Sequence, residues 1–414
     1  MDPISVFILI FFFIFYFWVS YNTPILATGV MRMRKARSRK KKTTTENVRL
    51  PSISVIVPTK NEEKVIERLI VSLLNLEYPS DKKEIVLVED GSTDKTPEIC
   101  RAYAERYPGI EFLQQEKSTG KPSALNLGFR HAKGEIAAIF DSDNIPESDV
   151  LLKAVTYFED PSVGAVQGTT CIVNEDENML TKFASYEETV WLKNYLQGKD
   201  ALGLFVPLTG SCQFIRKDVV LEVGPWDEKA LAEDLEMSAR ITEKGYDVRY
   251  APDVISWQEA PSNVTQMVRQ RIRWFRGYME VALKYGRFLR KLRRKTLDAE
   301  ITLMGPFLLA SFILCYLAPF YITFYTVGDT FFLMITQTTM LLTLLTLLVG
   351  GIALIYATKP MKIRNVLWLP FIYTYWNLQC ILTSYALFQI IFRRPRRWNK
   401  TEKTGRYTQS VIYP

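Results

Sequence analysis

Residues 136–144 read Ile-Ala-Ala-Ile-Phe-Asp-Ser-Asp-Asn, an uncharged apolar run that ends in two aspartates one residue apart. A short, continuously apolar run between helical patterns predicts a strand buried in a parallel sheet. In such folds, ligands bind beyond the carboxyl ends of the strands. Two carboxylates at that edge can hold one hard divalent cation, so we assign Asp141 and Asp143 to a magnesium or manganese ion. An exposed turn is the alternative for Asp-Ser-Asp taken alone.

The same alternation of strand and helix surrounds this run and predicts an α/β fold with a mostly parallel sheet. The expected strands are 53–57, 84–88, 110–113, 136–140, 163–168, 207–214 and 248–251. The expected helices are 62–76, 97–107, 122–132, 231–244 and 263–285.

Polar residues follow the first two expected strands. Thr59 and Glu62 follow one, and Glu89 and Asp90 follow the next, where a carboxylate can accept from a base N–H or from ribose hydroxyls. A capped turn is the competing interpretation of the second pair. Lys121 lies in Gly-Lys-Pro-Ser, which lacks the first glycine of a phosphate-binding loop and has a proline after the lysine. A Walker ATPase is therefore excluded, and Lys121 either meets a phosphate or is simply solvated.

Two further motifs lie about forty residues apart. Leu231 to Glu236 read Leu-Ala-Glu-Asp-Leu-Glu, and the pair Glu233-Asp234 is suited to act as a general base on a hydroxyl. Stabilisation of the helix dipole is the alternative. In the stretch 269–277, Gln270, Arg273 and Trp274 share one helical face, where arginine can bind a diphosphate and tryptophan can stack on a sugar. An amphipathic helix at a bilayer surface is the alternative here.

Four uncharged runs exceed the roughly 20 residues that cross a bilayer. They are residues 3–31, 301–328, 330–358 and 365–392. The first run is too long to be only a removable signal peptide, and it lacks the basic residues with which a signal peptide starts. The net charge of +8 is concentrated beside these runs. This position favours an interaction of the cationic side chains with the membrane surface over nucleic-acid binding. We therefore expect a multi-pass cell-membrane protein with a cytoplasmic middle region and an external N-terminus.

The composition excludes several kinds of chemistry. The chain has one histidine and five cysteines without a Cys-x-x-Cys spacing, so a Ser-His centre, a zinc site and a disulfide framework are not expected.

Together these motifs resemble the membrane-embedded family-2 glycosyltransferases, namely the cellulose, chitin, hyaluronan and poly-N-acetylglucosamine synthases. The likeness covers about residues 52–403 and rests on Val-Glu-Asp-Gly-Ser, Asp-Ser-Asp, Thr-Gly-Ser-Cys, Ala-Glu-Asp and Gln-x-x-Arg-Trp. Ala232 and Glu89 replace the threonine and aspartate that are common in that family, which leaves the sugar undefined.

The resemblance implies a GT-A nucleotide-sugar domain and specific roles for matched residues. Asp90 would contact uracil, Asp141 the nucleotide and Asp143 the metal, while Asp234 would be the base. Thr209, Gly210 and Ser211 would line the acceptor site. Gln270, Arg273 and Trp274 would hold the diphosphate and the acceptor sugar.

The tail carries a weaker match, in which Trp398, Thr401 and Lys403 follow the aromatic-x-x-Thr-x-Lys layout of the cellulose-synthase gating segment. That match requires a cytoplasmic C-terminus, so we interpret 365–392, the most polar run, as interfacial or re-entrant. The expected organisation is a span (1–31), a basic cytoplasmic linker (32–50), the GT-A domain (51–260), interfacial helices (261–298), two spans (299–358), the interfacial segment (365–392) and the tail (393–414).

We therefore expect an inverting, metal-dependent enzyme that transfers sugar from a UDP-sugar to a growing β-linked poly- or oligosaccharide. Three spans make a narrow export path, so export would need an oligomer or an accessory subunit. One alternative is non-processive transfer to a lipid acceptor. Another is a transporter or sensor with a degenerate nucleotide domain, which the complete set of carboxylates disfavours.

Overall fold

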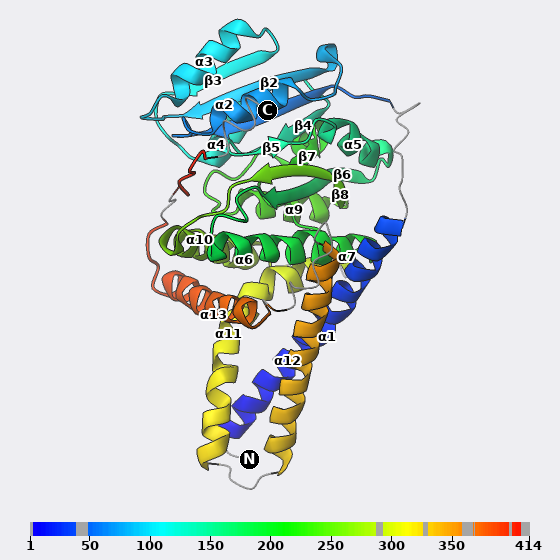
Figure 1. Ribbon diagram of the computed structural model, residues 1–414, viewed down its shortest axis with the longest axis vertical. Coiled ribbons are helices and arrows are strands. Elements are labelled where there is room, and N and C mark those ends of the chain that lie inside the picture. The colour runs from blue at the N-terminus through cyan, green and yellow to red at the C-terminus, as the bar shows by residue number, and fades with distance from the viewer. Residues whose placement is uncertain are drawn as a thin grey trace.

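The computed structural model describes residues 3–38, 49–286, 293–325, 330–357, 367, 369–396 and 400–406. Its centre is an eight-stranded sheet in the order β3-β2-β1-β4-β7-β6-β8-β5 (Figure 1). The strands β1 to β4 pair in parallel, as do β6 and β8, whereas β7 and β5 run antiparallel to their neighbours. The strand bounds are β1 Ile53–Thr59, β2 Lys83–Asp90, β3 Ile110–Gln115, β4 Ile136–Ile139, β5 Ile145–Pro146, β6 Val163–Ile172, β7 Gln213–Arg216 and β8 Asp247–Gln258.

Helices cover both faces of the sheet, because alternate side chains of the buried strands point to opposite sides. Val55 and Val57 of β1 pack toward α2, α3 and α5, whereas Ile56 packs toward α4, α8 and α9. The predicted α/β class with a mostly parallel sheet is thus confirmed. The bounds are α2 Ile66–Leu74, η1 Ser80–Lys82, α3 Thr96–Arg106, α4 Lys121–His131, α5 Val150–Thr156, η2 Tyr157–Glu159, α8 Lys217–Val223 and α9 Glu233–Lys244.

The expected strand at 207–214 is wrong over most of its length, because β7 begins only at Gln213. The preceding residues form a loop in which Gly210 and Cys212 have positive φ angles of 88° and 50°. Left-handed backbone cannot continue an extended strand. The residues that we assigned to acceptor binding therefore lie on a loop at the sheet edge.

A second layer of helices lies below the sheet, and three long helices extend away from it (Figure 1). The layer contains α10 and one continuous helical rod made of α6, the π-helical η3 and α7. The bounds are α1 Pro3–Ser38, α6 Met179–Glu188, η3 Thr189–Leu196, α7 Gln197–Ala201, α10 Val264–Tyr285, α11 Arg294–Tyr325, α12 Thr330–Ala357 and α13 Leu369–Ile391.

Three helices in the described ranges are long and apolar enough to cross a membrane. The candidate segments are Leu9–Lys35 in α1, Arg294–Ile313 in α11 and Leu333–Ile352 in α12. Helix α13 is not among them, although its residues form the fourth uncharged run.

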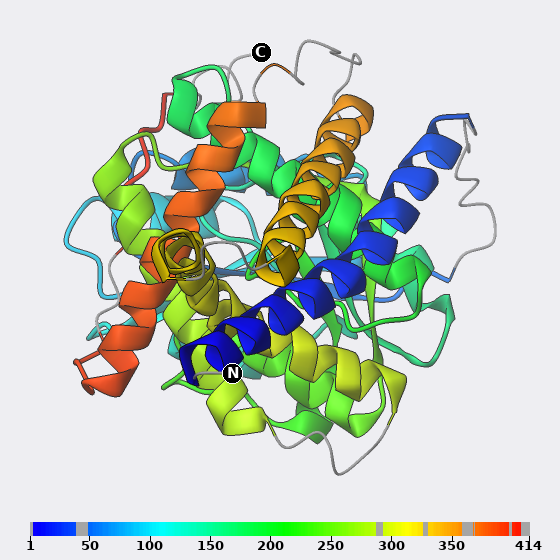
Figure 2. The ribbon, with the colours of Figure 1, turned by 90° about the horizontal axis from the view of Figure 1, so that it is seen from below.

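Helix α1 packs directly against the rod below the sheet, and Figure 2 shows it crossing the underside of the molecule. A Cβ atom on Gly29 would clash with the backbone of Asn194, and one on Gly198 would clash with the backbone of Ile25. Beside this crossing, Lys199 of α7 is buried and pairs at 2.7 Å with Asp298 of α11. The first helix is therefore joined closely to the sheet domain.

Candidate active site

The centre of the candidate site is the ammonium group of Lys121, which begins α4. Its Nζ lies 2.6 Å from Asp141 Oδ1 and 3.3 Å from Glu233 Oε1, and it donates to the Gly210 carbonyl at 2.9 Å. Three sequence-predicted residues from three separate segments thus meet at the ammonium group of a fourth, Lys121. Burial alone would lower the pKa of Lys121, but the neighbouring carboxylates of Asp141 and Glu233 raise it above its ordinary value.

Asp234, beside Glu233 in the first turn of α9, is a carboxyl group prepared to accept a proton near neutral pH. Burial raises the pKa of Asp234 to about 7, the neighbouring Glu233 adds to that rise, and Lys121 opposes it. Its Oδ2 faces the loop at Gly210, where an added Cβ would lie 3.1 Å from that oxygen. A carboxylate with a pKa near neutrality is suited to general-base chemistry.

Arg273 supplies a second cation to the same region. Burial holds the pKa of Arg273 below its ordinary value, while Glu233, Asp234 and Asp141 act in the opposite direction. Its Nε is buried and has no hydrogen-bond partner within the described ranges. A guanidinium that retains a free donor is suited to bind an anion such as a diphosphate.

The other two residues of this motif have protein partners. Gln270 Nε2 donates to Thr401 Oγ1 at 3.5 Å, which joins α10 to the tail. Trp274 is 37 % exposed, and the guanidinium carbon of Arg271 lies 4.3 Å from the centre of a Trp274 ring. A sugar that stacks on Trp274 would therefore use the face opposite Arg271.

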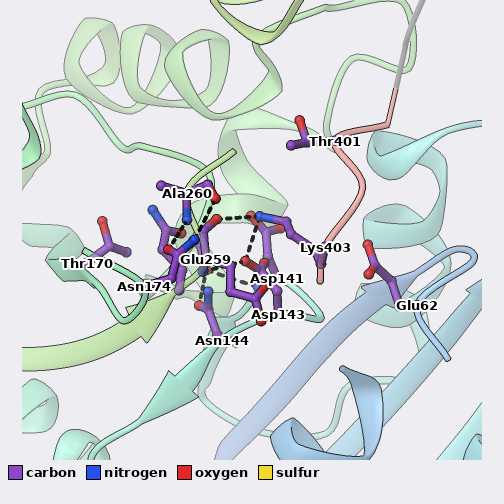
Figure 3. Close-up of polar contacts among 12 residues, drawn as sticks. Glu62, Asp141, Asp143, Asn144, Thr170, Asn174, Glu259, Ala260, Thr401 and Lys403 are labelled. Carbon is purple, nitrogen blue, oxygen red and sulfur yellow. Dashed lines mark hydrogen bonds and ion pairs between the residues drawn. The ribbon is translucent and has the colours of Figure 1, made fainter. Parts of the chain in front are cut away.

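The second aspartate of the Asp-Ser-Asp motif is held by the tail (Figure 3). Asp143 Oδ2 lies 2.7 Å from Lys403 Nζ and also accepts from the Glu259 amide at 3.1 Å. Burial would raise the pKa of Asp143, but Lys403 and Arg68 hold it below its ordinary value. Asp143 is therefore prepared to remain charged beside a cation.

Further contacts fix the tail over the site. Lys403 also donates to the Glu259 carbonyl at 2.8 Å, and Glu259 Oε2 accepts from the Thr404 amide at 2.8 Å. Lys400 pairs with Glu62 at 3.3 Å. Burial raises the pKa of Glu62 to about 7, against the effect of Lys400. Trp398, which we assigned to the same segment, lies outside the described residues.

At the opposite end of the strand edge, the residues assigned to the nucleoside already have protein partners. Asp90 accepts from Ser118 Oγ at 2.8 Å and from the amides of Thr119 and Gly120 at 2.7 and 3.0 Å. Glu89 accepts from the Ser92 amide through one oxygen. Its other oxygen, like Thr59 Oγ1, is buried without a partner within the described ranges.

The loop assigned to the acceptor supports the metal motif. Ser211 Oγ accepts from the Asp141 amide at 3.0 Å and donates to Asn144. The Thr209 amide donates to Gln167 at 2.8 Å, while Thr209 Oγ1 is buried without a partner in the described part of the chain. Ser211 therefore binds the backbone amide of Asp141 in the structure, whereas the hydroxyl group of Thr209 has no hydrogen-bond partner among the described residues.

The residues at this edge are suited to a divalent cation. Asp141 and Asp143 each already hold an ammonium group, so Lys121 and Lys403 occupy positions where positive charge is favoured. Within the described ranges there is no cluster of three or more His, Cys, Asp or Glu ligands. Magnesium and manganese tolerate such a sparse protein set, because waters and substrate phosphates complete their coordination.

Sequence reasoning missed Arg68 and Glu259. They form a fully buried ion pair at 2.6 Å, and Arg68 also donates to the Asp143 carbonyl at 2.8 Å. Arg68 follows Glu67 in the otherwise uncharged helix α2, and an arginine on the apolar, buried face of that helix was the one available signal.

Comparisons with known proteins identify the family of this chain. The profile of "Glycosyltransferase like family 2" matches residues 51–277. A beta-monoglucosyldiacylglycerol synthase of Nostoc sp. is 34% identical over 63% of this chain and 56% of its own length. A poly-beta-1,6-N-acetyl-D-glucosamine synthase of Staphylococcus epidermidis is 28% identical over 58% of this chain and 57% of its own length. The match thus spans less than two thirds of either relative.

One solved structure shares the fold. It is a mannosyltransferase from Pyrobaculum calidifontis in complex with GDP-Man and Mn2+, with a TM-score of 0.60, 21% identity, and coverage of 93% of this chain and 100% of that one. The chain belongs to the family-2 glycosyltransferases, and its sheet domain has the GT-A fold. The predicted family, fold and enzyme class are confirmed.

Proposed function

We propose that this protein transfers a sugar from a UDP-sugar, with inversion, to an acceptor held at the cytosolic face of the cell membrane. The observation that carries the proposal is the cluster around Lys121, which pairs with Asp141 and Glu233. The charges of these two carboxylates and of Asp234 also act on the guanidinium of Arg273. A carboxylate with a pKa near neutrality, close to cations that can support a departing diphosphate, is what this reaction needs.

In this proposal, Asp234 takes the proton of the acceptor hydroxyl as that oxygen attacks the anomeric carbon from the face opposite the diphosphate. Attack from that face inverts the configuration. Lys121 and Arg273 stabilise the negative charge that develops on the leaving group. Asp141 and Asp143 would hold the divalent ion, which neutralises diphosphate charge when it is bound.

The uracil assignment rests on the family resemblance and on Asp90, Glu89 and Thr59. Because Asp90 accepts three hydrogen bonds from residues 118–120, that segment would form part of the base pocket with it. The unpartnered Glu89 oxygen and Thr59 hydroxyl lie at the end of the two strands that border it.

We favour a lipid-anchored acceptor over a growing polymer. Three helices of the described residues are long and apolar enough to span a membrane, and three spans make a narrow export path for a polymer. Secretion of a polymer would need an oligomer or an accessory subunit. The similarity to a glucosyldiacylglycerol synthase points the same way, whereas the similarity to a poly-N-acetylglucosamine synthase keeps the polymer as the second candidate.

The membrane arrangement that fits this function has α1, α11 and α12 as spans and α13 on the cytosolic surface. The sheet domain and the tail would then share one side of the membrane.

One experiment separates the candidates. Purified full-length protein is incubated with each of several UDP-sugars, Mn²⁺ and diacylglycerol, and products are analysed by thin-layer chromatography and mass spectrometry. We expect one UDP-sugar to give a lipid with a single added sugar, and Asp234→Asn to give none. Lipid-independent accumulation of a polymer would establish the second candidate. Sugar transfer by Asp234→Asn at the wild-type rate would disprove the assignment of the base.

A further inference from the structure

A cavity of about 570 Å³ lies outside the site described above. It opens between residues 227–231, the second half of α10 and the segment 390–396 at the end of α13. Neither Lys121 nor Asp143 lines it. Its wall contains Gly277, where an added Cβ would lie 2.9 Å from Ala232 Cβ, so the cavity lies directly behind the residue that precedes the pair Glu233-Asp234.

The charges of this cavity do not balance. Three acidic side chains line it, and each already has a cationic partner. Asp227 pairs with Lys284 at 2.7 Å, Glu280 with Arg276 at 2.9 Å, and Glu236 with Arg240 at 2.7 Å.

Six cationic side chains line the same cavity, which leaves an excess of three positive charges (6 − 3). Arg396 shares Glu280 at 3.0 Å. Lys229, Arg393 and Arg394 have no acidic partner in the described part of the chain. Unpaired cations grouped at one opening favour an anion.

The rest of the lining is apolar and indicates that the anion carries a hydrocarbon part. Leu231, Val281, Leu283 and Ile390 all contribute to the wall. A free inorganic anion would leave this apolar surface in contact with water, whereas a glycerol-linked acyl chain would cover it.

The outer face of α13 gives an independent indication of a membrane surface. Ile381, Tyr385, Phe388 and Phe392 follow the i, i+4, i+7, i+11 spacing and are 57%, 50%, 42% and 60% exposed. An exposed apolar stripe that ends in a group of arginines is typical of a helix lying in a bilayer interface. The cations at 393–396 would then lie at the depth of lipid phosphates.

We propose that this cavity binds the phosphate of an anionic phospholipid, with Lys229, Arg393 and Arg394 as the phosphate ligands. The proposal goes beyond the sugar transfer proposed above and does not depend on it. The cavity lies close to two parts of the candidate active site. Leu231 and Glu236, which line it, lie on either side of the pair Glu233-Asp234 in the sequence. Residues 393–396, which also line it, precede in the chain the segment whose Lys403 pairs with Asp143. A bound lipid would fix both.

The test uses the full-length protein, stripped of lipid in detergent. Native mass spectrometry counts the molecules retained when dioleoylphosphatidylglycerol or dioleoylphosphatidylcholine is added, and calorimetry measures binding of inorganic phosphate. The test variant is Arg393→Gln/Arg394→Gln, whose side chains are exposed, so the fold is retained. The matched control is Arg101→Gln/Arg106→Gln on α3, at the far end of the molecule (Figure 1).

We expect the wild type and the control to retain phosphatidylglycerol in preference to phosphatidylcholine. The test variant should bind phosphatidylglycerol about 30-fold more weakly, because each cation near an anionic lipid contributes roughly fivefold. Equal retention of both lipids by the wild type, or unchanged retention by the test variant, would overturn the proposal. Phosphate binding that depends on Arg393 and Arg394 without lipid retention would instead identify a soluble anion as the ligand and reject the lipid. These readouts need no sugar transfer, so they remain valid if the proposed function fails.

Discussion

The raised pKa of Asp234 makes a quantitative prediction for the dependence of activity on pH. Burial and Glu233 bring the pKa of this carboxyl group to about 7, and only its deprotonated form can accept a proton. The deprotonated fraction is then roughly one tenth at pH 6 and nine tenths at pH 8. We therefore expect kcat/KM to rise about tenfold from pH 6 to pH 8. An aspartate with an ordinary pKa would give a flat profile across this range.

Two neighbouring substitutions should move this profile in opposite directions. Glu233→Gln removes a negative charge that raises the pKa of Asp234, so the rise in kcat/KM should shift to lower pH. Lys121→Gln removes a positive charge that lowers the same pKa, so the rise should shift to higher pH. These shifts are independent of any fall in the maximum rate.

The assay measures initial rates of UDP release at constant ionic strength and saturating Mn²⁺, with the donor well below its KM. Under these conditions the profile reports the free enzyme. Asp234→Asn is the control, and it should lose about 10²- to 10⁴-fold in rate. A flat wild-type profile between pH 6 and pH 8, or shifts of the same sign in both variants, would show that Asp234 is not the titrating base.

Three other predictions follow from the site and the membrane arrangement. Lys403→Met removes the cation that pairs with Asp143, and a charged hydrogen bond contributes about 1.5 kcal/mol or more, so Mn²⁺ should bind about tenfold more tightly, as measured by electron paramagnetic resonance. Unchanged Mn²⁺ affinity would show that the tail does not compete with the metal. Gly210→Ala should lower thermal stability by about 1–2 kcal/mol and reduce the maximum rate, because φ is 88° and the new Cβ approaches Asp234; a variant as stable and active as the wild type would contradict the strained loop. A cysteine introduced near residue 2 should react with an impermeant reagent on intact cells, whereas one near residue 410 should not; external labelling at 410 would require a fourth span.

Much of the sheet was predictable because its strands are buried on both faces. The runs at β1, β2 and β4 are continuously apolar, so both their extent and the polar residues after them could be located from the sequence. The loop at Gly210 was not, because Pro207 to Phe214 has a strand-like composition and the positive φ angles of Gly210 and Cys212 depend on tertiary contacts.

The polar contacts of the candidate site were predictable only in part. Lys121 at the start of α4 and Asp141 after β4 both lie at the carboxyl edge of the parallel strands, so their meeting was predictable. Glu233 reaches them from a helix whose position the sequence did not define. The ion pair of Lys403 with Asp143 joins residues 260 positions apart in the chain. The tail motif resembled a gating segment, yet no local pattern indicated which carboxylate the lysine would meet.

The contact between α1 and the rod below the sheet limits how this enzyme can be truncated for expression and how it assembles. Since Gly29 and Gly198 bring two backbones into contact, the amino-terminal helix completes the underside of the sheet domain. A truncated, water-soluble version that starts at the sheet would expose the surface of the rod against which Ile25 packs. It would also remove Tyr21, whose hydroxyl group accepts a hydrogen bond from Lys199. During synthesis, α1 leaves the ribosome long before residues 179–201, so its contact with the rod can form only after those residues have emerged. Expression trials should therefore keep the first helix in place.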